Sequence, residues 1–477
     1  MVRKHAKIAL VNPPPPQGAF IHYQNPPIGL AYLAAILEAN DFDVKVIDCP
    51  PLNINYENLK REIKSFQPNA VGITSVTVTS TSAFKVARIV KETFPETLTI
   101  LGGPHVTVLD EQILMDHPEV DIVVRGEGEQ TMLELANLIA NSNFKVLDSV
   151  AGITFRRSGR IIRTPDRPFI QNLDQLPRPA YKYFPLEKYK IFGKLILPIL
   201  ASRGCPYRCA FCLAPKMAGK KVRARSPKSI VDELEWLRDA CRADAISFHD
   251  ETFTYYEARV LKICEEIKKR KIDLPWDCST RVDCVSKKLL ATMKSANCQL
   301  VSFGVESGSQ KILEMMRKGT TVEQNEKAIK IAKEVGLSVT ISIIIGYPGE
   351  TEETLKQTLD FIRRTEPDDV HISIATPYPG TELYDLVKNL GWRMVKEWHC
   401  FDMQTPVFDN PNLPIDLKEE RRKFYSEFYS PKYVLLQSFK GFRGNLYCRI
   451  MARAALNNII LRNKLFKRIG KRGHSKA

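Results

Sequence analysis

Three cysteines follow one another closely between residues 202 and 212, at the spacing Cys-x3-Cys-x2-Cys. They are Cys205, Cys209 and Cys212, and the aromatic residue Phe211 stands directly before the last of them. Three thiolates on one short loop can bind three irons of a four-iron cluster, whereas ordinary electron-transfer clusters take four cysteines and zinc sites usually close with a fourth Cys or His. The next cysteine, Cys241, follows only after a basic stretch and a predicted helix. The spacing predicts a cluster whose fourth iron is open to a small molecule; the alternatives are a zinc knuckle with a distant ligand, or three core thiols.

The composition bounds the class of protein. The chain has 477 residues, enough for two or three domains, and 44% of them are hydrophobic. Its eleven cysteines are an odd number without a disulfide-like spacing, which favours a reducing compartment. The apolar run at residues 8–11 is too short for a signal peptide, and no stretch reaches the ~20 apolar residues of a transmembrane helix. We expect a cytoplasmic protein, either soluble or bound peripherally to a membrane.

The formal charge of +16 is concentrated at the carboxyl end of the chain. Residues 418–477 hold sixteen Lys or Arg against three Glu, a net of +13, which leaves +3 for the preceding 417 residues. Beyond residue 440, apolar residues mostly four apart share one face of a predicted helix and basic residues flank it. Such a helix suits an anionic membrane surface, so we expect the helical basic region 396–477 to contact the inner face of the membrane. The alternative is a helix that caps the preceding domain; nucleic acid is not favoured, because only Phe466 follows Tyr447 as an aromatic residue for stacking.

Short apolar strands alternate with helical periods through residues 1–145. The strands are predicted at 7–11, 44–47, 70–74, 98–101 and 122–124, with helices between them, for example at 30–39, 56–66 and 83–94. This alternation predicts a doubly wound parallel sheet, which binds ligands beyond the carboxyl ends of its strands. Glycines at those ends would let a bulky ligand approach the backbone, although each motif taken singly is equally consistent with a tight turn. The candidates are Asn12, Ser75, Thr77, Gly102, Gly103, Pro104, Gly126, Glu127 and Gly128.

The alternation pauses between residues 146 and 190 and then resumes. A hairpin that turns at Ser158-Gly159 and a proline-rich stretch at 164–185 predict a linker between two domains. Through residues 191–395, strands are expected at 197–202, 245–248, 276–279, 300–304, 338–345 and 370–374. Six strand–helix units form a partial (β/α)6 barrel of the TIM type, whose active site lies at the carboxyl ends of its strands. The three cysteines follow the first of these strands.

Further polar and glycine-rich motifs stand near the ends of these strands. They contain Arg225, Asp250, Glu251, Glu306, Ser307, Gly346, Pro348 and Gly349. Each has a plain structural alternative: the Gly346 motif is a turn, Glu306 caps a helix, and Arg225 lies on a solvated surface. Their common position near strand ends, beside the cysteine run, favours one shared site.

Taken in order, these motifs resemble those of the cobalamin-dependent radical S-adenosylmethionine (SAM) enzymes. The resemblance rests on the cysteine run and on four earlier motifs: Asn12-Pro-Pro, Pro-Pro-Ile-Gly-Leu-Ala-Tyr-Leu-Ala at 26–34, Gly102-Gly-Pro-His105 and Gly126-Glu-Gly-Glu129. It implies a [4Fe-4S] cluster on the three cysteines, SAM chelated to the open iron, and cobalamin in the first domain. It further implies that Phe211, Arg225 and the motifs after the later strands bind SAM, and that the strand-end residues of the first domain bind cobalamin. No histidine stands in an Asp-x-His-x-x-Gly motif, so the implied cobalt has no His ligand.

The resemblance also implies a reaction. SAM is cleaved to a 5′-deoxyadenosyl radical, and methylcobalamin supplies a methyl group to the substrate radical. The leading prediction is a methyltransferase that acts anaerobically at an unactivated carbon of a lipid-like or other hydrophobic substrate, with an electron donor such as flavodoxin or ferredoxin. The alternative is an oxidative cyclase or ring-forming enzyme with the same cofactors and a tetrapyrrole or lipid substrate. A methylthiotransferase of transfer RNA would need a second cluster, yet the first domain has only Cys49, and a cobalamin sensor would not need the cysteine run.

Overall fold

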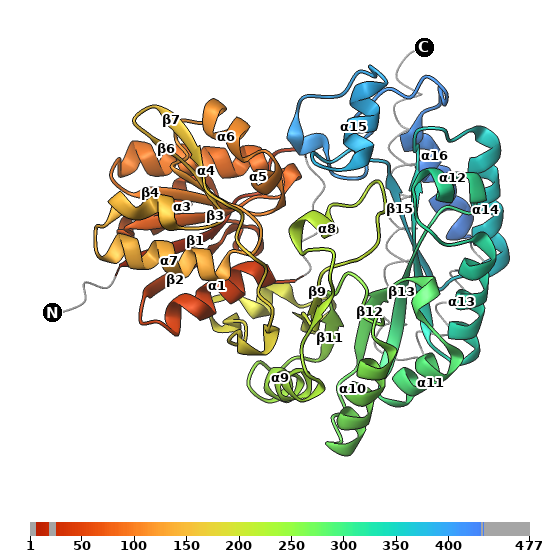
Figure 1. The fold of residues 1–477 in the computed structure, drawn as a ribbon. Helices are drawn as coiled ribbons and strands as arrows, with labels where there is room; N and C mark the ends of the chain where they lie inside the picture. The colour runs from red at the N-terminus through yellow and green to blue at the C-terminus, as the bar shows by residue number, and fades with distance from the viewer. Residues whose placement is uncertain (1–5, 19–24, 431–432, 434–477) are drawn as a thin grey trace, which may run out of the picture.

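The computed structural model of the chain describes residues 6–18, 25–430 and 433. Two α/β units lie side by side, the first coloured red to yellow and the second green to blue in Figure 1. The predicted amphipathic helix beyond residue 440 lies outside the described residues. Among the described residues, no helix is both long enough and apolar enough to cross a bilayer.

The first unit is built on a seven-stranded sheet in the order β2-β1-β3-β4-β5-β6-β7. Its strands are β1 (Lys7–Asn12), β2 (Asp43–Asp48), β3 (Ala70–Thr74), β4 (Leu98–Gly102), β5 (Ile122–Val124), β6 (Ile153–Arg157) and β7 (Arg160–Arg163). The first five are parallel, as the alternating pattern predicts. The strand order reverses direction at β1, so a crevice is expected beyond the carboxyl ends of β1 and β3.

Helices cover both faces of this sheet. On one face, α1 (Ile28–Glu38) packs beside α7 (Glu129–Ala140), and their apolar residues enter the same core as those of β1. The other face is covered by a second core that includes residues of α3 (Tyr56–Phe66) and α4 (Ser80–Thr93). The short helices of this unit are α2 (Cys49–Leu52), α5 (Pro104–Val108) and α6 (Asp110–Asp116).

The predicted hairpin forms at residues 153–163, but it extends the first sheet instead of lying in a separate connector. Strand β6 pairs with β5 in antiparallel fashion, and β7 pairs with β6. The buried guanidinium of Arg125, just after β5, donates to the carbonyl of Thr164, just after β7, and pairs with Asp166 at 2.9 Å. The hairpin therefore covers the edge that β5 would otherwise leave unpaired.

The second unit is an open barrel of six parallel strands in the order β15-β14-β13-β12-β11-β8. The strands are β8 (Ile196–Ile199), β11 (Ala245–Phe248), β12 (Trp276–Thr280), β13 (Cys298–Glu306), β14 (Ser338–Ile345) and β15 (Asp369–Ile374). Its helices are α9 (Pro227–Asp239), α10 (Glu257–Lys269), α11 (Lys287–Ser295), α12 (Gln310–Met315), α13 (Val322–Glu334), α14 (Glu352–Thr365), α15 (Glu382–Asn389) and α16 (Leu417–Phe428). The predicted α/β fold, with a parallel first sheet and a partial barrel, is confirmed.

Local sequence explains where several of these helices begin. Ser226, Ser286, Thr321 and Thr351 each precede a helix and accept a hydrogen bond from a backbone N–H of its first turn. The free edge of β15 is covered by α16, since the backbone N–H of Ile372 donates to the Tyr425 hydroxyl over 3.0 Å. Helix α16 thereby covers this edge of the open barrel, and no further strand pairs with β15 among the described residues.

The two units share one continuous apolar core. It contains residues of β1, α1 and α7 together with residues of β8 and β11–β14. Residues of the segment between the units complete it: the Tyr181 hydroxyl donates to the carbonyl of Pro198 over 2.6 Å, and that of Tyr189 to Asp48 over 2.5 Å. The carboxyl ends of the two sheets are held against each other by this shared core.

Candidate functional site

The cysteine run forms a loop that lies between the two units. It leaves the barrel through β9 (Ser202–Arg203) and ends at the short helix α8 (Ala214–Met217), which stands between the units in Figure 1. Hydrogen bonds hold the loop at both ends: the Cys205 N–H donates to the carbonyl of Gly219 over 3.0 Å, and the Ala210 N–H to that of Met316 over 2.9 Å. Only glycine fits at position 204, because its φ is +103° and a Cβ there would collide with the Lys221 carbonyl. Strand β9 pairs with β10 (Arg223–Ala224), so the loop closes on itself.

The three thiols are close enough to act on one another. Burial raises the pKa of Cys212 to about 11, and the nearby Cys209 and Cys205 add to this increase. Burial also raises the pKa of Cys209, whereas the cations of Lys318 and Arg281 lower it. As thiolates, these three soft donors would repel one another. The positive irons of a cluster and the neighbouring cations would offset that repulsion, so the loop suits an iron–sulfur cluster. Among the described residues, no three Cys, His, Asp or Glu side chains gather around one point as ligands of a single ion do.

Arg281 links the cysteine loop to the end of β12. Its Nη1 atom lies 3.8 Å from the Cys209 sulfur, and its guanidinium stacks 3.6 Å above the Tyr207 ring. Two further bonds of 2.9 Å join it to Asp283, and one of 2.9 Å joins it to the Lys318 carbonyl. The side chain is therefore fixed with one donor directed at the Cys209 sulfur.

Glu306 and Ser307 lie at the end of β13, as predicted, but both have protein partners. The carboxylate of Glu306 forms a buried ion pair of 2.8 Å with Lys318, and its backbone has a φ of +67° after a bulge in the strand. The Ser307 hydroxyl lies 3.1 Å from that of Thr358 on α14. At Gly308 an added Cβ would come within 2.7 Å of the Thr358 Cα, so this glycine allows α14 to pack closely and is not open to a ligand.

Arg225 and Asp250 are likewise occupied. Arg225 pairs with the fully buried Glu233 at 2.7 Å, so its charge is already neutralised. Asp250 accepts hydrogen bonds from the Ala201 N–H at 2.8 Å and from the Ser202 hydroxyl, and thus fixes the start of the cysteine loop. That either binds SAM remains a prediction; the contacts show that Asp250 positions the start of the loop and that Arg225 is bound to α9.

Three more of the residues predicted for SAM form the turn after β14. They are Gly346, Pro348 and Gly349, and the Gly346 N–H donates to the buried carboxylate of Glu350. Burial raises the pKa of Glu350 to about 8. Leu417 of α16 covers the side of Gly346 that a Cβ would occupy.

Phe211 packs into a small third core near this turn. That core includes Tyr347 of the turn and Leu383 of α15. The Leu383 N–H also donates to the Ala210 carbonyl over 2.8 Å, so the segment after β15 holds the cysteine loop from a second side.

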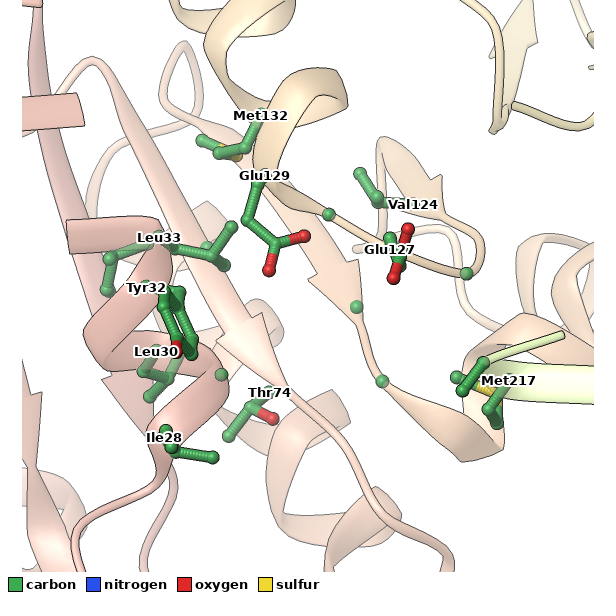
Figure 2. Close-up of a pocket in the computed structure, with 18 of the residues that line it drawn as sticks. Ile28, Leu30, Tyr32, Leu33, Thr74, Val124, Glu127, Glu129, Met132 and Met217 are labelled. Atoms are coloured by element: carbon green, nitrogen blue, oxygen red, sulfur yellow. The ribbon is translucent and has the colours of Figure 1, made fainter. Parts of the chain in front are cut away.

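A cavity of about 310 Å³ lies at the carboxyl ends of the first sheet and reaches the cysteine loop. Five of the predicted residues line it: Gly102, Gly103, Gly126, Glu127 and Gly128. Figure 2 shows Tyr32 and Leu33 of α1 on one side, Glu129 and Met132 of α7 above, and Met217 of α8 opposite. The barrel contributes Leu200, Arg203 and Glu251, and the Glu251 Oε2 atom is buried without a hydrogen-bond partner among the described residues.

This cavity fits one part of a cobalamin. A whole cobalamin is larger than the cavity, and the glycine-rich walls would admit a flat group against the backbone. No histidine is among the described residues that line it. The unpartnered Glu251 oxygen is available in this space as a hydrogen-bond acceptor for a ligand N–H group.

Four of the residues predicted for cobalamin lie outside the lining of this cavity. Asn12 donates to Asp48 over 2.9 Å, and Thr77 lies 3.3 Å from Nδ1 of the buried His105. Pro104 begins α5, and the Ser75 hydroxyl is buried without a partner among the described residues. Asn12 and Thr77 therefore have structural contacts of their own, while a role for any of the four in cobalamin binding remains a prediction.

Sequence reasoning missed the basic residues that join the two units. Arg203, two positions before Cys205, pairs with Glu127 and Glu129, and Arg223 pairs with Glu127. Glu127 was singled out because of its glycine neighbours, but nothing in the residue pattern indicated a partner more than 70 positions away. Only the meeting of the two units brings these charges together.

Comparison with known proteins agrees with this geometry. The Radical SAM superfamily pattern matches residues 199–362, and the B12 binding domain pattern matches residues 18–136. An uncharacterized methyltransferase of Pyrococcus horikoshii is 35% identical over 91% of this chain and 95% of its own length. The anaerobic magnesium-protoporphyrin IX monomethyl ester cyclase of Rubrivivax gelatinosus is 33% identical over 88% of this chain and 77% of its own. The chain belongs to the cobalamin-dependent radical SAM enzymes.

Solved structures share the fold of both units. The radical SAM methyltransferase TsrM from Kitasatospora setae, with cobalamin and a [4Fe-4S] cluster bound, superposes with a TM-score of 0.73 at 19% identity and covers 95% of this chain and 100% of its own. The cobalamin-dependent radical enzyme OxsB superposes with a TM-score of 0.66 at 22% identity, over 83% of this chain and 56% of its own. A [4Fe-4S] cluster, SAM and cobalamin are the cofactors of the family.

Proposed function

We propose that this enzyme transfers a methyl group from SAM to an unactivated carbon of a hydrophobic substrate. The observation that carries the proposal is the shared cavity: the glycine loops of the first unit bound the same space as Arg203 and Met217, which stand at the two ends of the cysteine loop. Two cofactors held on those loops would face each other across the junction. A methyltransferase at 35% identity over 91% of this chain supports the same reading.

The roles of the residues follow from their chemistry. Cys205, Cys209 and Cys212 would hold the cluster, which when bound supplies an electron to cleave SAM. Phe211, Glu251 and the turn at Gly346 lie around the cysteine loop, and we assign them to the SAM pocket, whereas the Glu306–Lys318 ion pair shapes its wall. Gly102, Gly103, Gly126 and Gly128 would hold part of the cobalamin, which when bound supplies the methyl group. The shared apolar core holds the two units, and with them the two loops, together.

A cyclisation is the second candidate, because a relative of 33% identity is named as a magnesium-protoporphyrin IX monomethyl ester cyclase. Cofactor residues alone do not separate the two reactions, since both begin with the same radical. The hydrophobic substrate and the membrane contact rest on the basic amphipathic pattern beyond residue 440.

The two reactions differ in their products. The enzyme would be reconstituted anaerobically with iron, sulfide, cobalamin and a low-potential reductant, then incubated with a lipid and pigment extract and SAM that carries a trideuterated methyl group. Methyl transfer yields S-adenosylhomocysteine and 5′-deoxyadenosine in equal amounts, and a product heavier by one trideuterated methyl group. Formation of 5′-deoxyadenosine with an unlabelled, cyclised product would instead establish the alternative.

The cobalt environment can be tested without turnover. Because no histidine lines the cavity among the described residues, we expect no protein nitrogen on the cobalt of bound cob(II)alamin, so its electron paramagnetic resonance spectrum should be the same with unlabelled and with ¹⁵N-labelled protein. A change in the nitrogen hyperfine splitting on labelling would contradict this expectation, and failure to bind cobalamin would contradict the assignment of the cavity.

A further inference from the structure

Four charged side chains form a chain of ion pairs where the two units meet. Arg203 contacts two carboxylates at once, through Nη1 to Glu127 at 3.0 Å and through Nη2 to Glu129 at 2.6 Å. Arg223 contacts Glu127 at 2.9 Å. The side chains are 4–11% exposed, so two cations and two anions balance each other away from water.

The network joins the two proposed cofactor sites. Arg203 stands on β9, two residues before Cys205, and is the partner of Arg223 in the β9–β10 pair. Glu127 belongs to the loop between β5 and α7 and Glu129 is the first residue of α7; both line the cavity, as does Arg203 itself. Figure 2 shows both carboxylates at the rim of this space. A molecule in the cavity therefore touches the same side chains that hold the first residues of the cysteine loop.

The carboxylate side of the network is built to adjust. Glycines 126 and 128 flank Glu127, and a Cβ added at Gly126 would meet no atom within 4 Å. The cysteine side is more firmly held, since Arg223 also donates to the carbonyls of Ile170 at 2.6 Å and Ala218 at 2.7 Å. Glu127 also accepts a hydrogen bond from the Ile170 N–H over 2.7 Å, so of its partners only Arg203 leads directly into the cysteine loop.

We propose that Arg203 is a positioning residue that couples occupancy of the cobalamin cavity to the SAM-binding geometry of the cysteine loop. Cobalamin fixes the loop at 126–128, the two carboxylates then fix Arg203, and Arg203 fixes the backbone that leads into Cys205. Because such coupling is reciprocal, SAM strengthens cobalamin binding by the same factor. The inference rests on the proposed placement of the two cofactors.

The planar fork of arginine is what the arrangement requires. Its two terminal nitrogens reach two different carboxylates, whereas the single ammonium of lysine keeps the charge but cannot bridge both in this geometry. Arg203→Lys therefore tests the coupling without leaving two buried carboxylates uncompensated. The matched control is Arg167→Lys, because Arg167 also pairs with a glutamate of α7, Glu134, but its hydrogen bonds and ion pairs among the described residues all lie within the first unit.

The experiment measures SAM affinity by equilibrium dialysis on cluster-loaded protein, with and without saturating hydroxocobalamin. Iron content and the absorbance of bound cobalamin are recorded for every variant. We expect cobalamin to raise the SAM affinity of the wild type and of Arg167→Lys at least about fivefold, the lower end of typical site-to-site coupling. In Arg203→Lys the factor should fall below two while both cofactors remain bound.

The possible outcomes are distinct. A wild-type factor below two, or an unchanged factor in Arg203→Lys, overturns the inference and leaves the proposed function intact. If wild-type protein fails to bind the cluster or cobalamin, the proposed function fails and the inference with it. If Arg203→Lys loses its cluster, the measurement is repeated with Glu129→Gln, which breaks the Arg203–Glu129 pair from the first unit and leaves the cysteine loop unaltered. A coupling factor below two in that variant supports the inference, and an unchanged factor overturns it.

A second, independent observation concerns the outer surface of the cysteine loop. Between residues 201 and 222 every exposed residue is basic; these are Arg208, Lys216, Lys220 and Lys221. No Asp or Glu occurs from 202 to 231. Among the described residues none of the four takes part in an ion pair, and the backbone at Gly219 bonds directly to Cys205.

The geometry points to this surface as the docking site of an acidic electron-carrier protein. The cluster must receive an electron from outside, and unpaired cations beside it would steer an anionic donor to the nearest point of contact. This inference also rests on the cysteines holding the cluster.

Cluster reduction can be followed by stopped-flow absorbance with photoreduced flavodoxin or, as a cationic control, reduced methyl viologen. In Lys216→Gln/Lys220→Gln/Lys221→Gln we expect the flavodoxin rate at low salt to fall at least tenfold and to lose its salt dependence, with the viologen rate unchanged. The control Lys327→Gln/Lys330→Gln/Lys356→Gln removes exposed charges from α13 and α14. An equal effect in both triple variants, or an equal loss with viologen, overturns the docking site.

Discussion

At the residue scale, the charges beside the cysteine loop determine how readily a cluster there accepts an electron. Arg281 directs a donor at the Cys209 sulfur from 3.8 Å, and Lys318 lowers the pKa of the same thiol. Hydrogen bonds and positive charges near the sulfurs favour the reduced, more negative cluster. Asp283 offsets part of the Arg281 charge through its paired contacts of 2.9 Å.

Replacing Arg281 with leucine should make the cluster harder to reduce. At an effective dielectric constant near 20, and with Asp283 offsetting part of the charge, the lost interaction is about 1 kcal/mol. For a one-electron couple this corresponds to a midpoint potential roughly 40 mV more negative. A redox titration followed by electron paramagnetic resonance measures the shift, with Arg364→Leu, which breaks the surface pair with Glu326, as the control. A potential that rises in Arg281→Leu would contradict the electrostatic argument.

The cysteine ligands themselves give a second prediction at this scale. Anaerobically reconstituted protein should bind about four irons and four sulfides, and Cys209→Ala should lose the cluster together with SAM cleavage. Cys264→Ala is the control, because Cys264 is fully buried on α10 as a packing residue. Production of 5′-deoxyadenosine by Cys209→Ala would show that the assignment is incorrect.

At the element scale, strand ends were predictable and side-chain partners were not. The alternation of apolar strands and helices located β1–β5 and the six barrel strands, and the glycines after β4 and β5 were correctly placed at the sheet edge. The partners of Arg225 and Glu306 could not be read from the sequence, because Glu233 and Lys318 are ordinary surface residue types until the fold buries them. The close packing of α14 on Gly308 could not be read from the sequence either.

The turn after β14 supplies a pH-dependent prediction. Burial raises the pKa of Glu350 to about 8, so between pH 4.5 and 8 the folded protein holds a proton that the unfolded chain has released. Stability from this group is therefore complete at low pH and decreases as pH rises towards 8, by at most about 1.4 kcal/mol per pH unit. The free energy of unfolding of the wild type, relative to Glu350→Gln, should fall between pH 5 and 8 in guanidinium titrations. A difference that stays constant over this range would mean that Glu350 is ionised in the folded protein.

At the scale of the whole molecule, the described residues form the two units that bound the shared cavity, and most of the positive charge lies in the basic region at the carboxyl end. Residues 441–477 contain ten Lys or Arg and no Asp or Glu, whereas residues 1–417 carry only +3. Because the positive charge is concentrated at the carboxyl end, an anionic surface would attract the protein mainly through that end of the chain. If that surface is a membrane, the enzyme would encounter its proposed hydrophobic substrate at the bilayer.

Removing residues 441–477 should abolish binding to anionic liposomes. Each basic residue near such a surface contributes roughly 1 kcal/mol, so loss of even a few contacts lowers the bound fraction many-fold. Flotation of the full chain and of a chain truncated after Lys440 measures this directly, with neutral liposomes and raised salt as controls, because the electrostatic attraction is screened by salt. Iron and cobalamin contents should be the same in both proteins, which shows that the truncated body is folded. Equal recovery of the two proteins with anionic liposomes would exclude the membrane contact and favour a helix that packs on the barrel.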